Sequence, residues 1–358
     1  MRKGWWVLAP IALIAFALVA LPVSALTDTG IERDLREALG MDLGECEPIT
    51  NLASPWTEGR ALTANRDEPR IGVIDGKAYL VGGVTEVTHS PGERLLLTPS
   101  DQLTRFDPVS ETYEELAPLP ERLNHVGVVV YRGDLYALGG YGERVDADTS
   151  DRFHRYDPDA DRWTRMPDMP EPRAAMAVGV VGDTLVVAGG ARNRVPAAEA
   201  FAYDFESRRW SRLPDMGSRR EHVGDAVLGD KLYVLGGRAP DSLAVDTAER
   251  FDLGSRRWEA LAPMPVPAGG LAAVADGDRV IALGGGDDGV GTVTGAVQEF
   301  DQSSGKWSLL PALRTPRHGQ GATVLGKKIW VFGGSACAYF NATDRVEWLP
   351  LDAANSPG

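Results

Sequence analysis

The chain has few cysteines, few histidines and a deficit of positive charge. Its 358 residues include 2 Cys and 5 His, and its 37 Lys and Arg are outnumbered by 51 Asp and Glu. The formal net charge of −14 should repel DNA and anionic membrane surfaces, so we predict that the protein does not bind nucleic acid. Hydrophobic residues (43%) and charged residues (25%) occur in the proportions of an ordinary globular protein.

The N-terminus differs from the rest of the chain. Two basic residues precede an uncharged run over residues 4–21, and the small residues Ser24 and Ala25 follow it where a signal peptidase reads. We therefore predict a signal peptide over residues 1–25 and an exported protein, periplasmic or extracellular. Cleavage would change the net charge from −14 to −16, because two positive charges are lost. The run is also long enough for a membrane anchor, and this alternative stays open.

Export permits disulfides, and the two cysteines lie near opposite ends of the mature chain. Cys46 precedes the first repeat described below, and Cys337 lies in the last one. We predict a Cys46–Cys337 disulfide, which would stabilise the fold by about 4–5 kcal/mol in the chain-entropy model because its loop is so long. Two unpaired thiols are the alternative.

A Gly-Gly doublet recurs six times directly after a short apolar run. The first glycines of these doublets are Gly82, Gly139, Gly189, Gly236, Gly284 and Gly333. The period of roughly 50 residues indicates a repeated unit that buries its hydrophobic faces only by stacking on its neighbours. After each of the first five doublets, two aromatic residues stand seven positions apart, with turn-forming residues between them. The pairs are Phe106 and Tyr113, Tyr156 and Trp163, Tyr203 and Trp210, Phe251 and Trp258, and Phe300 and Trp307. Each repeat therefore predicts four short strands.

This order of doublet, aromatic residue and Trp resembles the kelch repeat, although Tyr113 stands where that family usually has Trp. The resemblance implies an all-β fold, a six-bladed β-propeller of four-stranded blades. The sixth repeat ends after its third strand, so we predict that the N-terminal segment Ser54-Pro55-Trp56 supplies the outer strand of the last blade. Such closure removes exposed sheet edges.

The predicted domain organisation follows from these patterns. After the signal segment, residues 26–52 form a linker with a short amphipathic helix. The propeller occupies residues 53–352, and residues 353–358 form a tail.

Arginines gather in two sets of loops that should share one face of the propeller, because strand direction alternates within a blade. We call it the mouth face. The loops entering the first strands carry Arg66, Arg122, Arg173, Arg219 (or Arg220) and Arg317, and the loops after the doublets carry Arg144, Arg192, Arg194 and Arg238. Guanidinium groups suit carboxylates, sulfates and phosphates, and some kelch propellers hold acidic peptides on this face. Kelch arginines at the entering position also often brace a neighbouring blade, and this reading stays open.

Three histidines lie in the same entering loops: His125 and His222 at corresponding positions, and His318 beside Arg317. Three converging imidazoles could hold a metal. Histidine is, however, a routine variant in kelch repeats, and no carboxylate partner stands out by its spacing to these histidines. We therefore predict no metal and no cofactor, and we assign His125 and His222 to ligand binding.

The leading functional prediction is a binding or scaffold module without catalytic residues. We expect a monomer that binds a protein partner, or an anionic small molecule or sugar, on its mouth face. One alternative is a sugar-modifying enzyme of the exported N-acetylneuraminate epimerase type, with Glu221, His222, His125 and Glu143 as acid–base candidates. A galactose-oxidase-like copper enzyme is less favoured, because it needs a Tyr–Cys cross-link and only Cys337 has a tyrosine nearby.

Overall fold

The computed structural model describes residues 50–353 except 52, 89–95, 143–148, 288, 290 and 338–340. The chain divides into two units, Met1–Glu47 and Pro48–Gly358, and all described residues belong to the second. The predicted signal peptide, the predicted linker helix and Cys46 lie outside the described residues. Within the described part, no helix is long and apolar enough to cross a membrane.

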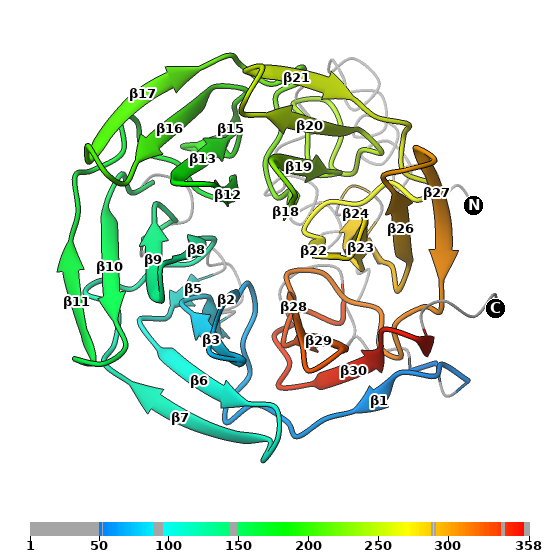
Figure 1. The fold of residues 1–358 in the computed structure, drawn as a ribbon. Helices are drawn as coiled ribbons and strands as arrows, with labels where there is room; N and C mark the ends of the chain where they lie inside the picture. Colours follow the sequence, from blue (N-terminus) through cyan, green and yellow to red (C-terminus); the bar gives the residue numbers. More distant parts are fainter. Residues whose placement is uncertain are drawn as a thin grey trace, which may run out of the picture. The chain divides into compact units, whose positions relative to one another are not determined.

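Six antiparallel sheets of four strands stand around a common axis, which confirms the predicted all-β, six-bladed propeller (Figure 1). The strands of blades 1 to 3, from the axis outward, are β2 (Arg70–Ile74), β3 (Lys77–Val81), β6 (Leu103–Asp107) and β7 (Thr112–Leu116); β8 (Gly127–Tyr131), β9 (Asp134–Leu138), β10 (Phe153–Asp157) and β11 (Arg162–Arg165); and β12 (Ala177–Val181), β13 (Thr184–Ala188), β16 (Ala200–Asp204) and β17 (Arg209–Leu213). Those of blades 4 and 5 are β18 (Gly224–Leu228), β19 (Lys231–Leu235), β20 (Ala248–Asp252) and β21 (Arg257–Ala260); and β22 (Ala272–Asp276), β23 (Arg279–Leu283), β26 (Val297–Asp301) and β27 (Lys306–Leu310).

Blade 6 combines the two ends of the propeller sequence. Its inner strands are β28 (Gly321–Leu325), β29 (Lys328–Phe332) and β30 (Val346–Pro350), and the short strand β1 (Thr57–Glu58) pairs antiparallel with β30. Trp56 is buried just before β1, and its indole Nε1 donates a hydrogen bond to the Pro311 carbonyl of blade 5. The outer-strand tryptophans of blades 2 to 5 each make the same kind of bond to the preceding blade.

The Gly-Gly doublets join neighbouring blades. In blade 1, both glycines have positive φ, and Gly83 N donates a hydrogen bond to the Leu123 carbonyl of blade 2 at 3.0 Å. A Cβ on Gly82 would lie 2.5 Å from the same carbonyl oxygen, so no larger residue fits there. The other five doublets repeat this contact, and blade 6 makes it to Arg66 of blade 1. The doublet is therefore a contact between blades as well as the end of a strand.

The loops after the doublets of blades 1, 3 and 5 form hairpins. These pair β4 (Val84–Thr88) with β5 (Leu96–Pro99), β14 (Ala191–Arg192) with β15 (Val195–Pro196), and β24 (Gly286–Asp287) with β25 (Thr292–Val293). The hydrophobic core lies in clusters between adjacent blades, as where Val81 and Leu103 of blade 1 pack with Leu135 and Tyr156 of blade 2. Each blade thus completes the core of its neighbour.

Candidate functional site

The two sets of loops meet in every blade. One antiparallel bridge joins each entering loop to the loop after the doublet of the same blade. The bridges are Asp67 with Val84, Asn124 with Tyr141, Ala174 with Ala191, Glu221 with Arg238, Gly269 with Gly286, and His318 with Ser335. The side chains of both sets therefore flank the same end of the propeller axis, the mouth face.

The residue sixteen positions before each doublet points into its own blade wherever it is an arginine. Four blades have arginine here, each 3% exposed or less: Arg66, Arg173, Arg220 and Arg317. In blade 4, the guanidinium of Arg220 donates to the carbonyls of Gly236 and Thr247 and forms an ion pair with Glu249 at 2.6 Å. Arg317 pairs with buried Glu347 at the same distance. We call these four residues the brace arginines.

The other two blades lack this arginine. Blade 5 has Ala268, and the buried amide of Gln298 there replaces the carboxylate, exchanging hydrogen bonds with Val266 N and O. Blade 2 has buried Leu123. The brace is therefore an arginine–carboxylate pair in some blades and a smaller neutral contact in others.

The mouth arginines separate into buried and exposed groups. Arg66, Arg173 and Arg317 are brace arginines bonded within the protein. Arg122 and Arg219 stand one position earlier than the brace, and both are exposed; the Arg122 side chain is 59% accessible. The sequence left Arg219 or Arg220 open in blade 4, and the structure gives the position of Arg66 to Arg220. In blade 2 the sequence pointed to Arg122, and the structure gives that position to Leu123.

The loops after the doublets carry a second exposed group. Arg192 and Arg194 of the β14–β15 hairpin are exposed, beside Val195, which is 61% exposed. Arg238 is half-buried, and its side chain covers Gly269, where a Cβ would lie 2.9 Å from Arg238 Cγ. Arg144 and Glu143 lie outside the described residues.

The residue fourteen positions before each doublet faces the axis. These six residues are Glu68, His125, Ala175, His222, Gly270 and Gly319, and all have φ between 50° and 65°. A chain of backbone hydrogen bonds links them: Glu68 N donates to Gly319 O, Gly319 N to Gly270 O, Gly270 N to His222 O, His222 N to Ala175 O, and Ala175 N to His125 O. We call this ring the axis ring. Glycine suits its backbone conformation, so the non-glycine side chains are held there at a cost in free energy.

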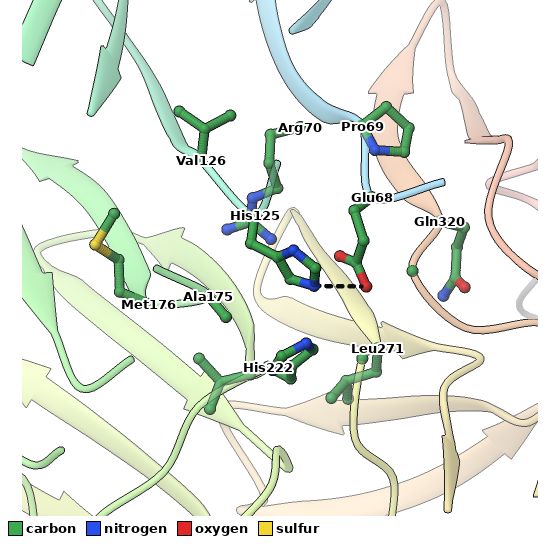
Figure 2. A pocket seen from close by; sticks show the side chains of 13 residues that line it. Glu68, Pro69, Arg70, His125, Val126, Ala175, Met176, His222, Leu271 and Gln320 are labelled. Atoms are coloured by element: carbon green, nitrogen blue, oxygen red, sulfur yellow. Dashed lines mark ion pairs between the residues drawn. The ribbon is translucent and has the colours of Figure 1, made fainter. Parts of the chain in front are cut away.

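Three side chains of the axis ring converge. His125 Nε2 lies 3.3 Å from Glu68 Oε1, and the rings of His125 and His222 are 4.5 Å apart between centroids (Figure 2). The residue preceding each histidine orients its imidazole through Nδ1. His125 Nδ1 lies 2.5 Å from Asn124 Oδ1, and His222 Nδ1 lies 2.7 Å from Glu221 Oε2. The two histidines predicted at corresponding positions are thus brought together.

His318 approaches the same centre from blade 6. It precedes the axis residue Gly319, and its Nε2 lies 3.1 Å from the Cys337 carbonyl. Asp67 lies close to both Glu68 and His318, with ligand atoms within 4.8 Å of one another, and accepts a hydrogen bond from Ser335 Oγ at 2.7 Å. A Cβ on Gly319 would collide with the carboxylates of Asp67 and Glu68, so glycine makes room for both.

The cluster strongly perturbs its own ionisation. Burial raises the pKa of Glu68, but nearby His125, with His222 and His318, lowers it, and the net pKa lies well below the usual range. Burial, together with Arg238 and His125, lowers the pKa of His222, which favours neutral imidazole. Burial and the adjacent Glu68 raise the pKa of Asp67.

The axis ring encloses a small cavity, the neck cavity, of about 20 Å³. It is lined by the axis ring and the residues that follow it, including Arg70, Val126 and Gln320 (Figure 2). Farther along the axis, Arg70 of blade 1 forms an ion pair with Asp225 of blade 4 beside a second cavity of about 70 Å³. The neck cavity has room for a water or an ion, since one water needs about 10–15 Å³.

Sequence reasoning missed Glu68 and Asp67 in this cluster. A signal was present: Glu68 lies fourteen residues before Gly82, as His125 and His222 do before their own doublets. Aligning the repeats on the doublets, rather than on the arginines, would have placed this carboxylate beside the two imidazoles.

The geometry defines a six-bladed propeller with a polar cluster on its axis. A family model described as the KLHDC2/KLHL20/DRC7 Kelch-repeats domain matches residues 125–334. The chain therefore belongs to the kelch-repeat family, as its doublets and aromatic pairs predict. No curated protein matches the chain. Kelch domains generally mediate protein binding, and this propeller fold is typical of binding and scaffold modules.

Proposed function

We propose that this chain is an exported kelch-repeat binding module that takes an acidic partner segment on its mouth face. The exposed arginines of three consecutive blades carry this proposal: Arg122 of blade 2, Arg192 of blade 3 and Arg219 of blade 4. The Arg122 and Arg192 side chains are 59% and 57% accessible, and each has a carboxylate only at the edge of ion-pair distance, 3.9 and 3.8 Å away.

The partner is expected to be a protein segment rather than a molecule inside the channel. The neck cavity admits only a water or an ion, so a larger ligand must stay above it on the loops. Exposed Val195 beside Arg192 adds an apolar contact, and half-buried Asp287 of blade 5 places negative charge elsewhere on the same face. This charge asymmetry would orient a partner and speed its association.

The test is capture of a partner from the exported fraction, followed by measurement of Kd against salt. The triple variant Arg122→Ala, Arg192→Ala and Arg219→Ala should lose the partner, or bind it with a flatter salt dependence. The control replaces Arg132, Arg162 and Arg257, which are exposed near turns between strands 1–2 or 3–4 of their blades, on the opposite face. Equal capture by both variants would exclude the mouth face as the binding site.

Export and the Cys46–Cys337 disulfide are part of this proposal. Cys337 is buried on the loop after the sixth doublet, 3% exposed. Thiol labelling of the exported chain, unfolded without reductant, should find no reactive cysteine. Two labelled thiols would contradict the bond.

A mutarotase is the second candidate, because Glu221, His222 and His125 meet at the neck, as its acid–base chemistry would require. The sugar would have to bind above the neck cavity. Anomer exchange of N-acetylneuraminate followed by proton NMR decides this point: a rate equal to the uncatalysed rate removes the candidate.

A further inference from the structure

We propose that Glu68, His125 and His222 form a binding site for a divalent transition-metal ion, zinc in the first instance, on the propeller axis. A ligand atom of each residue lies within 4.8 Å of the ligand atoms of the other two. The three come from blades 1, 2 and 4, so only the closed ring brings them together. The proposal goes beyond partner binding on the mouth loops and reverses the expectation of no metal.

The separation between His125 and Glu68 fits a shared ion. Nε2 of His125 and Oε1 of Glu68 are 3.3 Å apart, long for a charge-assisted hydrogen bond. Two ligands bound tetrahedrally to zinc, each about 2.0–2.1 Å from the ion, stand roughly 3.3–3.4 Å from one another. Buried Nε2 has no hydrogen bond within the described protein.

A side-chain oxygen beside Nδ1 of each imidazole orients that ring for coordination through its other nitrogen. Asn124 Oδ1 lies 2.5 Å from His125 Nδ1, and the Glu221 carboxylate lies 2.7 Å from His222 Nδ1. An acceptor at Nδ1 places the proton there and leaves a lone pair on Nε2 in the neutral ring. In His125 this lone pair would face a carboxylate oxygen, an arrangement that is repulsive unless a cation or a second proton lies between them.

The space and the strain of the ring are consistent with an ion. The neck cavity of about 20 Å³ holds one ion or water. Glycine at the equivalent positions of blades 5 and 6 keeps that space open, while Glu68, His125 and His222 carry side chains at φ of 50–55°. Strained residues of this kind collect at functional sites.

The donor set selects the class of ion. Two imidazoles and one carboxylate suit zinc and related transition metals, whereas magnesium and calcium prefer oxygen ligands. Three protein ligands leave a fourth position for water. His318 and Asp67 form a second group with Glu68, in which the ligand atoms also lie within 4.8 Å of one another.

The test uses the chain without a histidine tag, stripped with a chelator and titrated with Zn²⁺ against a chromophoric chelator. Wild type should bind one Zn²⁺ per chain, and Co²⁺ should give the absorption of a low-symmetry site. His222→Gln and Glu68→Gln should weaken Zn²⁺ binding by at least about 100-fold. Glu221→Gln should weaken it by about 10–100-fold, because Glu221 only orients the His222 ring.

His154→Gln is the matched control. His154 is also buried, and its Nε2 lies 3.1 Å from the Glu121 carboxylate, but it lies in β10, outside the axis ring. Its loss should leave Zn²⁺ binding unchanged. If His222→Gln fails to fold, Glu221→Gln and the Co²⁺ spectrum of wild type still decide. Absence of saturable binding, or ligand variants that bind like the control, would overturn the proposal, as would nitrogen NMR showing both His125 nitrogens protonated in protein given Zn²⁺.

Discussion

The brace arginines and the residues of the axis ring lie two positions apart in the same loops, yet their side chains point in different directions and contact different blades. Arg220 sits sixteen residues before its doublet and turns into the blade, where carbonyls and Glu249 satisfy it. His222 sits fourteen residues before the doublet, turns toward the axis and meets a histidine and a carboxylate of other blades. The brace connects the strands and loops of one blade, whereas the axis ring brings together ionisable side chains from several blades. A buried charged residue therefore indicates a stabilising contact in the brace, but a candidate binding site in the axis ring.

The largest expected effect comes from breaking a brace. Arg220→Ala leaves the buried carboxylate of Glu249 without a counter-charge, and should lower the free energy of unfolding by about 3–5 kcal/mol in denaturant titrations. The double variant Arg220→Ala with Glu249→Gln recreates the Ala268 and Gln298 pair of blade 5, and should recover on the order of 1–3 kcal/mol. A double variant no more stable than the single one would show that the carboxylate is not the source of the loss.

A smaller effect is expected from filling the axis ring. Gly319→Ala adds a Cβ against Asp67 and Glu68 at φ +65°. Gly326→Ala, in a turn of the same blade at φ +55° with open space around it, adds only backbone strain. The control should cost about 1–2 kcal/mol and the axis variant about 1–3 kcal/mol more, measured by thermal unfolding. Equal losses would mean that the two carboxylates move aside freely.

The smallest effect on stability is expected from replacing Arg219, the exposed neighbour of the brace arginine Arg220. Arg219 is exposed and adjacent to Arg220, so Arg219→Ala should change the free energy of unfolding by no more than about 0.5 kcal/mol. The same substitution should nevertheless weaken partner capture on the mouth face. A loss of stability close to that of Arg220→Ala would show that the two arginines share the bracing role.

The sequence predicted the propeller well because each blade repeats a local pattern. The doublets and aromatic pairs predict the strands, their number and the loops that share a face. The same pattern did not distinguish Arg219 from Arg220, because the two are adjacent in one entering loop and only the fold shows which side chain turns into the blade. It also left Glu68 unnoticed, since a single carboxylate between Asp67 and Pro69 has no signature apart from its distance to the doublet.

Local repetition alone thus determined six blades, their strand order and the loops of the mouth face, because each blade is specified by residues close in sequence. Only the tertiary structure decided which arginines are buried as brace arginines and which remain exposed on the mouth face. It alone brought Glu68, His125 and His222 around one cavity, because residues of blades 1, 2 and 4 become neighbours only when the ring places all six entering loops around a common axis.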